Sequence, residues 1–327
     1  MPENTSTHKP SSVTVTTTAR LHFGFLDPSG RSDQPFGSFG LSLDQPLTRL
    51  TLEPAETPSV SGPEGARAGR YLMTVAEACG IARTYRLEVT EAIPPHAGLG
   101  SGTQLALAVG AAFAAAEGLD LKPLEIAGIL GRGARSGIGM ATFEVGGAVL
   151  DAGPRDGALP QLLARVPFPE AWRALLIFDP ATKGLDGASE VAAFEALPAF
   201  PDAQAADLRA RIAETALPAL QNEDFESFCA QVGYLQDRMG AYFGPLQGGA
   251  YTSPCVGAVL RGLRADGVIG LGQSSWGPTG FAFAPDEETG QRLLAAAKAH
   301  AEAHAPQGDL RFTLARGRNS GADITVE

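Results

Sequence analysis

The sequence predicts an α+β fold divided into two domains. Its 327 residues exceed what one compact domain usually holds and suit two domains of ordinary size. Stretches with the period of a strand alternate with stretches of helical period along the first half of the chain. The second half combines long helical stretches with short strands, which indicates a small antiparallel sheet covered by helices. We therefore place a disordered tail at residues 1–12, an N-terminal domain at 13–168 and a C-terminal domain at 169–327.

The composition is that of a soluble protein with an acidic balance. Lys and Arg number 25 against 36 Asp and Glu, and the formal net charge of −11 argues against a surface that coats nucleic acid. The most apolar run, 105–116, reaches only about half a membrane span. Three separated cysteines fit a reducing compartment, and the first residues do not resemble a signal peptide. We expect a cytoplasmic protein with no nucleic-acid partner and no membrane partner.

The N-terminal half begins with a strand, because Val and Thr alternate over residues 12–18. A loop rich in Gly and Ser follows at 29–40, and a Gly-punctuated apolar segment closes this half at 136–151. Alternation and helical spacing predict the elements between these segments. They are an extended stretch at 41–52, a helix at 66–79, a strand at 85–90, a long helix ending near 117, and a short helix at 124–130.

The C-terminal half opens with a strand at 172–178, after a connector at 154–169 with one short strand. Acidic helical segments follow it, and three more strands and two more helices complete the chain. The helices are expected at 189–197, 201–240, 255–266 and 287–304, and the strands at 267–271, 280–284 and 310–314.

Residues 95–103 carry the strongest functional signal. Pro94 and Pro95 end the preceding strand, and three glycines alternate with other residues just before the long helix begins. Such glycines let the backbone approach an anion and adopt positive φ. The helix start directs unpaired amides and the positive end of its dipole at the loop. The pattern predicts a phosphate-binding loop, formed by Gly98, Leu99, Gly100, Ser101, Gly102, Thr103 and Gln104.

This loop differs from two common nucleotide-binding signatures. It lacks the Gly-Lys-Ser/Thr that ends a Walker A loop. No acidic residue closes a βαβ unit about twenty residues on, as a dinucleotide-binding fingerprint requires. A glycine turn that only caps the helix is the alternative interpretation.

The loop resembles the second motif of the GHMP superfamily, PxxxGLGSS, since Pro95 to Gly102 reads PHAGLGSG. Residues 19–24 stand in the place of the first motif, and residues 270–280 in the place of the third, Gly-rich motif. The resemblance implies a two-domain GHMP-kinase-like fold. Its N-terminal half would be ribosomal-protein-like with a left-handed βαβ unit, and its C-terminal half ferredoxin-like, with the site in the cleft between them. It also implies a homodimer.

Two positions depart from the kinases of this superfamily. The second Ser of GLGSS, which commonly assists Mg²⁺ in those kinases, is Gly102 here. Several members carry a catalytic Asp after Ser-Gly-Ile, and this chain has Gly139 at that position. Phosphoryl transfer needs the charge of a metal and often a carboxylate near the acceptor hydroxyl. The two replacements indicate that the scaffold is kept and that kinase chemistry is not.

The motifs resemble one branch of the superfamily, the β-ribofuranosylaminobenzene 5′-phosphate synthases of tetrahydromethanopterin biosynthesis. The resemblance implies a decarboxylating phosphoribosyltransferase of one-carbon metabolism. Such an enzyme condenses phosphoribosyl pyrophosphate (PRPP) with 4-hydroxybenzoate or 4-aminobenzoate and releases CO₂ and pyrophosphate. Mg²⁺ would accompany PRPP, ATP would not be needed, and no protein-bound metal is expected. The sequence does not distinguish a hydroxyl from an amino group at the para position of the benzoate.

The implied reaction gives roles to charged and polar residues of the three motifs. Arg20 can bind a phosphate through two hydrogen bonds. Ser274 and Ser275 either donate to phosphate or only form the turn. A carboxylate would stabilise positive charge at the ribosyl centre, and the candidates are Asp27 and Glu144.

Aromatic residues of the first and third motifs complete the expected site. Phe23, Phe25 and Trp276 would form an apolar slot for the benzoate ring. His22 can act as acid or base on the para substituent, because its ordinary pKa lies near neutrality. Each of these residues also has a structural interpretation. In it His22 is a hydrogen-bonded core residue, Phe23 and Phe25 belong to the core, and Trp276 is an anchor between the domains. His300 and His304 have the spacing of a metal pair, but no third ligand is apparent.

Two other functions remain open at this point. The first is an ATP-dependent kinase of small molecules, in which Thr103 and Glu144 supply the oxygens missing at Gly102 and Gly139. The second is a non-catalytic homologue that keeps only ligand binding.

Overall fold

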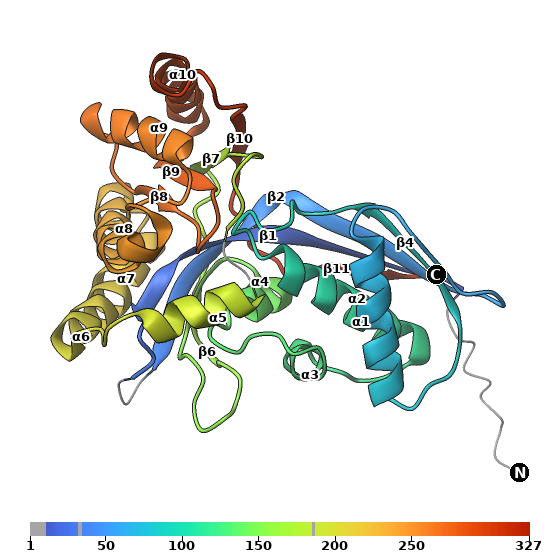
Figure 1. Cartoon of the computed structure of the whole chain (residues 1–327). Coiled ribbons are helices and arrows are strands. Elements are labelled where there is room, and N and C mark those ends of the chain that lie inside the picture. The colour runs from blue at the N-terminus through green and yellow to red at the C-terminus, as the bar shows by residue number, and fades with distance from the viewer. Residues whose placement is uncertain (1–10, 32–34, 185–186) are drawn as a thin grey trace, which may run out of the picture.

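Two sheets organise the chain in the computed structural model, which describes residues 11–31, 35–184 and 187–327 (Figure 1). One sheet has seven strands and the other has four. The two sheets lie next to each other, and helices pack on both of them (Figure 1). No helix in these described ranges is both long enough and apolar enough to cross a membrane.

The larger sheet is built on two long antiparallel strands, β1 (Val13–Asp27) and β2 (Phe36–Pro54). Its central order is β11-β1-β2-β4-β3, and β5 and β6 extend it beside β2. The remaining strands are β3 (Ser59–Ser61), β4 (Tyr85–Glu91), β5 (Ala148–Asp151), β6 (Leu162–Val166) and β11 (Asp323–Val326). β3 and β4 are parallel, and α1 (Gly65–Ala78) connects them, so this half contains a βαβ unit.

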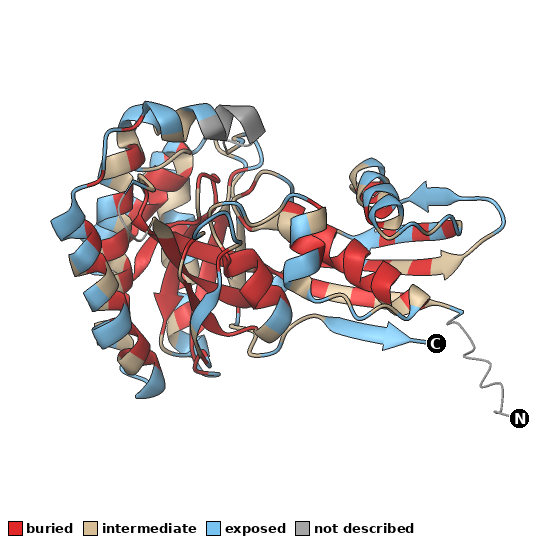
Figure 2. Ribbon diagram, turned by 90° about the horizontal axis from the view of Figure 1, so that it is seen from below, coloured by how far each residue is buried: buried red, intermediate tan, exposed pale blue. Residues whose placement is uncertain are grey.

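Three further helices pack with α1 on this sheet. They are α2 (Ser101–Glu117), α3 (Pro123–Ile129) and α4 (Ile138–Val145). α2 is apolar around its whole circumference and is buried along most of its length, as Figure 2 shows. Its burial fixes the position of its N-terminal end, where the predicted phosphate loop lies.

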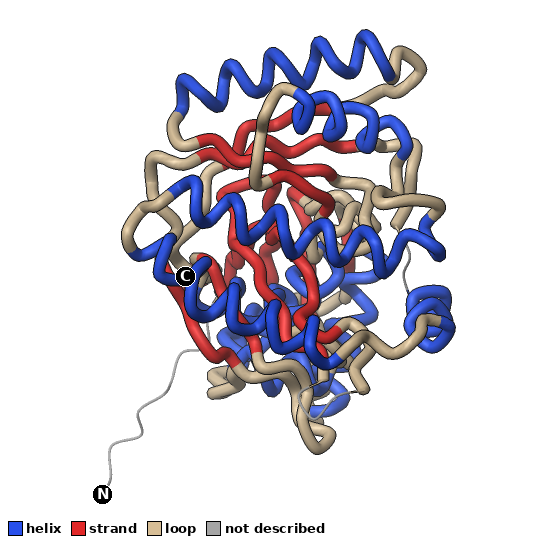
Figure 3. The backbone as a smooth tube through the Cα atoms, turned by 90° about the vertical axis from the view of Figure 1, so that its left-hand side faces the viewer, coloured by secondary structure: helices blue, strands red, loops and turns tan. Residues whose placement is uncertain are grey.

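The smaller sheet has the strand order β10-β7-β9-β8, and all its pairs are antiparallel. Its strands are β7 (Arg173–Phe178), β8 (Leu271–Gln273), β9 (Gly280–Ala284) and β10 (Arg311–Ala315). Two helices, α9 (Pro254–Ala265) and α10 (Glu287–His304), cover one face of it (Figure 3). In chain order these elements run β-α-β-β-α-β, which is the expected ferredoxin-like arrangement.

A group of helices is inserted between β7 and α9. They are α5 (Gly187–Ala196), α6 (Asp202–Arg211), a π-helical turn (Ile212–Ala216), α7 (Leu217–Gln221) and α8 (Phe225–Gln247). The single helix predicted at 201–240 is therefore wrong. Glu223 adopts a positive φ of 54°, and the Asp224 carboxylate accepts from the Ser227 amide, so a new helix starts there.

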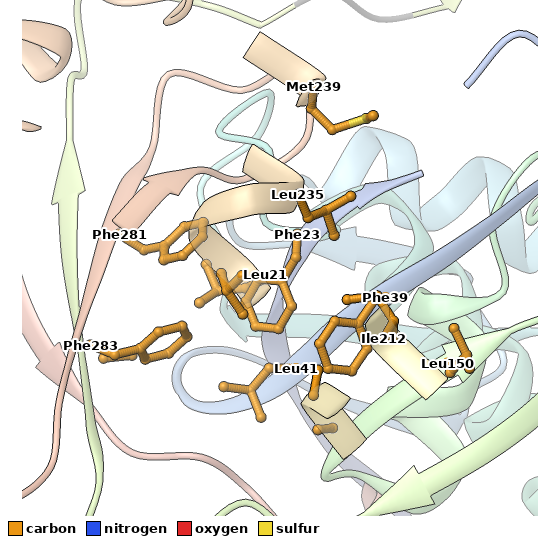
Figure 4. Packing of buried hydrophobic residues seen from close by; sticks show 14 of the residues in the cluster. Leu21, Phe23, Phe39, Leu41, Leu150, Ile212, Leu235, Met239, Phe281 and Phe283 are labelled. Carbon is orange, nitrogen blue, oxygen red and sulfur yellow. The ribbon is translucent and has the colours of Figure 1, made fainter. Parts of the chain in front are cut away.

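The inner face of the smaller sheet shares one core with the larger sheet. Phe23 of β1 lies between Phe281 and Phe283 of β9 and Leu235 of α8 (Figure 4). These side chains have no or almost no exposed area. The two halves are therefore fixed against each other by a continuous apolar core.

The structure differs from the expected elements at four strands and one helix. β3, β5, β11 and α4 were not predicted, and β8 lies at 271–273 and not at 267–271. β11 belongs to the larger sheet, where Val326 pairs with Val13. The last residues of the chain therefore lie outside the C-terminal domain, which was predicted to extend to residue 327. The expected tail at 1–12 lies outside the described residues except for Ser11 and Ser12, which bond to Glu327.

Candidate active site

The predicted phosphate loop has the backbone geometry of an anion site. Gly98 and Gly100 have φ values of 77° and 80°, and α2 begins directly at Ser101. The amides of Thr103 and Gln104 already donate to the carbonyl of Gly100. The amides of Ser101 and Gly102 have no hydrogen-bond partner among the described residues. Two amides and the positive end of α2 therefore remain for a ligand.

The three predicted motifs meet at the carbonyl of Gly98. It accepts hydrogen bonds from the Arg20 guanidinium and from the Ser274 hydroxyl, the latter at 2.7 Å. The same Ser274 hydroxyl accepts from the amide of His22 at 3.0 Å. A Cβ on Gly98 would lie 2.2 Å from the backbone oxygen of Ser274, so only glycine allows this close approach.

Three residues predicted to bind phosphate hold the loop in place by their side chains. Gln104 is fully buried, accepts from Thr17 and donates to the carbonyl of Gly139 at 2.8 Å. Leu99 belongs to the core and has 1% of its surface exposed. The Ser274 hydroxyl is bonded to the Gly98 carbonyl and the His22 amide. Their side chains are not free to face a ligand, which corrects the direct role expected for them.

A cavity of about 30 Å³ lies beside the contact between Ser274 and His22, between β1, α8 and the loop after β8. Five of the predicted residues line it, His22, Phe23, Phe25, Ser275 and Trp276. α8 contributes apolar walls that the sequence did not reveal, Met239 and Phe243. Ser275 therefore lies at the cavity and not in the phosphate loop.

His22 is the most unusual group in this cavity. Only 3% of its surface is exposed, and neither ring nitrogen has a hydrogen-bond partner among the described residues. Burial, with a smaller contribution from the positive charge of Arg20, lowers the pKa of His22 to about 3. The imidazole is therefore neutral near neutral pH. The indole Nε1 of Trp276, which is also buried, likewise lacks a partner among those residues.

Phe23 is among the residues that line the cavity, but its ring packs on core phenylalanines, so the predicted slot is corrected in this respect. Successive residues of a strand point to opposite faces, so the Phe23 ring packs into the core between the sheets (Figure 4). A register shift between His22 and Gly24 then turns the chain, and the rings of His22 and Phe25 lie 4.7 Å apart. The bulge brings these two rings to one cavity.

The two predicted carboxylates lie apart from the cavity. Asp27 is buried at the end of β1, where one of its oxygens accepts from the amide and the hydroxyl of Ser29. Glu144 is exposed near the end of α4, on the side of Lys122, which follows the C-terminal end of α2. The phosphate loop lies at the opposite end of α2. Neither carboxylate lines the cavity, so the role predicted for each at the ribosyl centre is not supported.

Neighbouring side chains crowd the two glycines that depart from the kinase pattern. A Cβ on Gly139 would lie 2.9 Å from the Thr103 side chain. A Cβ on Gly102 would lie 2.6 Å from Nη2 of Arg67 and 2.9 Å from Nη2 of Arg132. Neither arginine could be predicted from the sequence, because isolated arginines in α1 and after α3 carry no local pattern.

A different carboxylate, Asp151, is buried near Gly137 and supports the turn before α4. It accepts from the Ser38 hydroxyl, the Gly137 amide at 2.8 Å and the Gly153 amide at 2.7 Å. Burial raises the pKa of Asp151 against the opposing effect of these hydrogen bonds. Its bonds are satisfied locally, so it acts as a structural group.

The described residues hold no cluster of three or more His, Cys, Asp or Glu side chains that could bind a metal ion. His300 pairs with Asp266 at 2.6 Å and stacks on His304. This pair is therefore engaged in contacts between the last helix and the turn after α9.

Comparison with known proteins agrees with this geometry. Residues 67–147 match the GHMP kinases N terminal domain, and residues 216–303 match GHMP kinases C terminal. The chain is 30% identical to the β-ribofuranosylphenol 5′-phosphate synthase of Methanothermobacter thermautotrophicus, over 94% of this chain and 97% of that protein. It is also 30% identical to the protein of the same name from Archaeoglobus fulgidus, over 95% and 98% of the two chains.

Solved structures show the same fold at lower identity. Homoserine kinase from Cytophaga hutchinsonii superposes with a TM-score of 0.68 at 17% identity, covering 99% of this chain and 100% of that one. Mevalonate diphosphate decarboxylase from Staphylococcus aureus gives 0.65 at 16% identity, with 96% and 98% covered. The chain therefore belongs to the GHMP superfamily, in the family of the β-ribofuranosylphenol 5′-phosphate synthases.

Proposed function

We propose that the protein condenses PRPP with 4-hydroxybenzoate and releases pyrophosphate and CO₂, giving β-ribofuranosylphenol 5′-phosphate. The names of its relatives support a phenol product. The observation that carries the proposal is the cavity in which His22 and Trp276 present unpaired polar atoms, directly beside the phosphate loop. An aromatic ring with one polar para group and a phosphorylated sugar are the two ligands that this combination suits.

The phosphorylated substrate would bind at the N-terminal end of α2. The free amides of Ser101 and Gly102 can donate to phosphate oxygens. Arg20, already oriented by the carbonyl of Gly98, lies beside Gly100 and adds positive charge. This orientation would bring the anomeric carbon toward the cavity. The loop and His22 are close together, because the Ser274 hydroxyl bonds to both the Gly98 carbonyl and the His22 amide.

The ring would bind with its para hydroxyl between His22 and Trp276. The neutral imidazole can accept a hydrogen bond from the hydroxyl, and the indole N–H can donate one to its oxygen. The hydrogen bond to the imidazole polarises the O–H bond and raises electron density at the carbon para to it, which carries the carboxylate. An aromatic amino group is a poorer acceptor because its lone pair is delocalised into the ring. His22 and Trp276 together therefore favour 4-hydroxybenzoate over 4-aminobenzoate.

The bond changes follow from this placement. The anomeric C–O bond to pyrophosphate breaks, and the para carbon supplies the electron pair for the new C–C bond. The bond between that carbon and the carboxylate then breaks, its electrons restore the aromatic ring, and neutral CO₂ leaves. The protein holds the two substrates in contact and binds the departing anion, and the apolar walls favour loss of a neutral product.

The cavity has to widen to admit the ring. Its volume of about 30 Å³ holds one or two water molecules and not a benzene ring. Met239, an unbranched and flexible side chain, forms one wall, so its rotation can enlarge the space. Phe194 of α5 packs on Phe25 and Trp276, two of the residues that line the cavity.

We further propose that Mg²⁺ arrives with PRPP, as the resemblance to the family implies. The kinase alternative receives no support from Glu144, which is exposed at the far end of α4. The proposed reaction itself consumes no ATP. A homodimer in the cytoplasm stays our expectation from the family.

A turnover assay without ATP tests the proposal. The protein is incubated with PRPP, Mg²⁺ and either 4-hydroxybenzoate or 4-aminobenzoate, and the products are identified by mass spectrometry. We expect the phenol riboside phosphate to form, and faster than the aniline product. A parallel reaction with ATP and candidate alcohols should release no ADP. Steady ADP release without any riboside would overturn the proposal in favour of a kinase.

A further inference from the structure

Two arginine side chains from separate segments converge on the first turn of α2. Arg67 belongs to the first turn of α1, and Arg132 follows α3. Their Nη2 atoms lie 2.6 and 2.9 Å from the point where Gly102 would carry a Cβ. The absence of a side chain at Gly102 is what allows both guanidinium groups to approach the helix start.

The positive charge of this pair is only partly balanced by the protein. Arg67 contacts the Glu64 carboxylate at 3.5 Å and donates from Nε to the Tyr71 hydroxyl at 3.1 Å. Arg132 has no ion pair among the described residues, and its Nε is buried without a hydrogen-bond partner. Two like charges placed side by side repel each other, and more strongly where solvent is partly excluded. An anion between them removes this cost.

We propose that Arg67 and Arg132 bind the pyrophosphate group of PRPP, together with the amides of Ser101 and Gly102. Guanidinium groups present paired N–H donors that match the oxygens of a phosphate. Pyrophosphate carries more negative charge and more acceptor oxygens than the 5′-phosphate, so it suits a site with two guanidinium groups better. The identity of the ligand rests on the proposed function, whereas the anion site itself rests on the geometry above.

The pair also has a role in the chemistry. The pyrophosphate gains negative charge as the anomeric C–O bond breaks, so cations already in place stabilise the leaving group. The site would therefore bind free pyrophosphate, the product, as well as the pyrophosphate end of PRPP. This property allows a binding test that does not depend on turnover.

Calorimetric titration with inorganic pyrophosphate and, separately, with ribose 5-phosphate tests the proposal on the full chain. We expect Arg67→Ala and Arg132→Ala each to weaken pyrophosphate binding at least tenfold and ribose 5-phosphate binding less than threefold. Arg70→Ala is the matched control, because Arg70 is exposed on α1 and does not contact Gly102. It should leave both affinities unchanged.

A second variant avoids removing charge. Gly102→Ala places a methyl group where the guanidinium groups meet, and alanine favours the helix, so the variant should fold and still lose pyrophosphate affinity. Unchanged pyrophosphate affinity in both arginine variants, or a selective loss of ribose 5-phosphate binding, would overturn the proposal. If these variants lose pyrophosphate binding but the wild-type protein forms no riboside, the anion site stands and the proposed function fails.

Discussion

At the scale of single residues, the neutral state of His22 has a measurable consequence for stability. Its pKa is lowered to about 3 by burial, whereas an unfolded chain has an ordinary histidine with a pKa near 6.5. Between these values the unfolded state binds one proton more than the folded state. Stability is therefore lost as the pH falls, by up to about 1.4 kcal/mol per pH unit from this residue.

His22→Gln removes this titration and keeps a polar side chain. Between pH 6 and pH 4, the unfolding free energy of the variant should fall about 2 kcal/mol less than that of the wild type. Urea denaturation at a series of pH values measures the difference. Parallel curves for the two proteins would mean that His22 is protonated in the folded protein, contrary to its burial.

Trp276 should contribute a specific hydrogen bond to substrate recognition. Trp276→Phe keeps most of the apolar wall and removes the N–H, which is worth about 1.4 kcal/mol or a factor of ten. We expect KM for 4-hydroxybenzoate to rise about tenfold, with KM for PRPP nearly unchanged. Trp172→Phe is the control, because Trp172 is buried in the core outside the cavity. It should lower stability and leave both KM values near wild type.

At the scale of elements, the phosphate loop depends on contact with a loop far away in the sequence. Gly98 and Gly118 both have positive φ, 77° and 70°. A Cβ on Gly98 would meet the Ser274 carbonyl at 2.2 Å, whereas one on Gly118 meets nothing within 4 Å. The two positions separate the cost of a left-handed backbone from the cost of a steric clash.

Gly118→Ala should therefore lower the unfolding free energy by about 1 kcal/mol, the cost of alanine at positive φ. Gly98→Ala should cost at least about twice as much and should also weaken phosphate binding, because the loop has to move away from Ser274. Thermal denaturation and pyrophosphate titration measure both effects. Equal destabilisation of the two variants would show that the contact with Ser274 does not hold the loop.

Local pattern predicted those elements whose own residues determine their structure. The helix predicted at 287–304 and the strand predicted at 280–284 match α10 and β9. β11 carries Ile324 and Val326 with about half of their side-chain surface exposed, so its hydrophobicity gives no signal. It forms because β1 offers a free edge at Val13, which is a contact between opposite ends of the chain. Such pairing cannot be seen in a local window.

At the scale of the whole molecule, the candidate site was predictable only in part. The motifs gave His22, Phe25, Trp276 and the glycines of the loop, because each follows from spacing or from resemblance. Met239 and Phe243 could not be found, since they line the cavity only after α8 packs against β1. The arginines at Gly102 were missed for the same reason, and the exposed Glu144 was included because charge alone does not reveal position.

We propose that the two halves of the molecule bring PRPP and 4-hydroxybenzoate together for a decarboxylating condensation. The most direct test follows ¹⁴CO₂ from carboxyl-labelled 4-hydroxybenzoate and, in the same reaction without ATP, pyrophosphate from PRPP. We expect both to be released at equal rates and neither to be released when one substrate is left out. Pyrophosphate release without labelled CO₂, or no release of either, would contradict it.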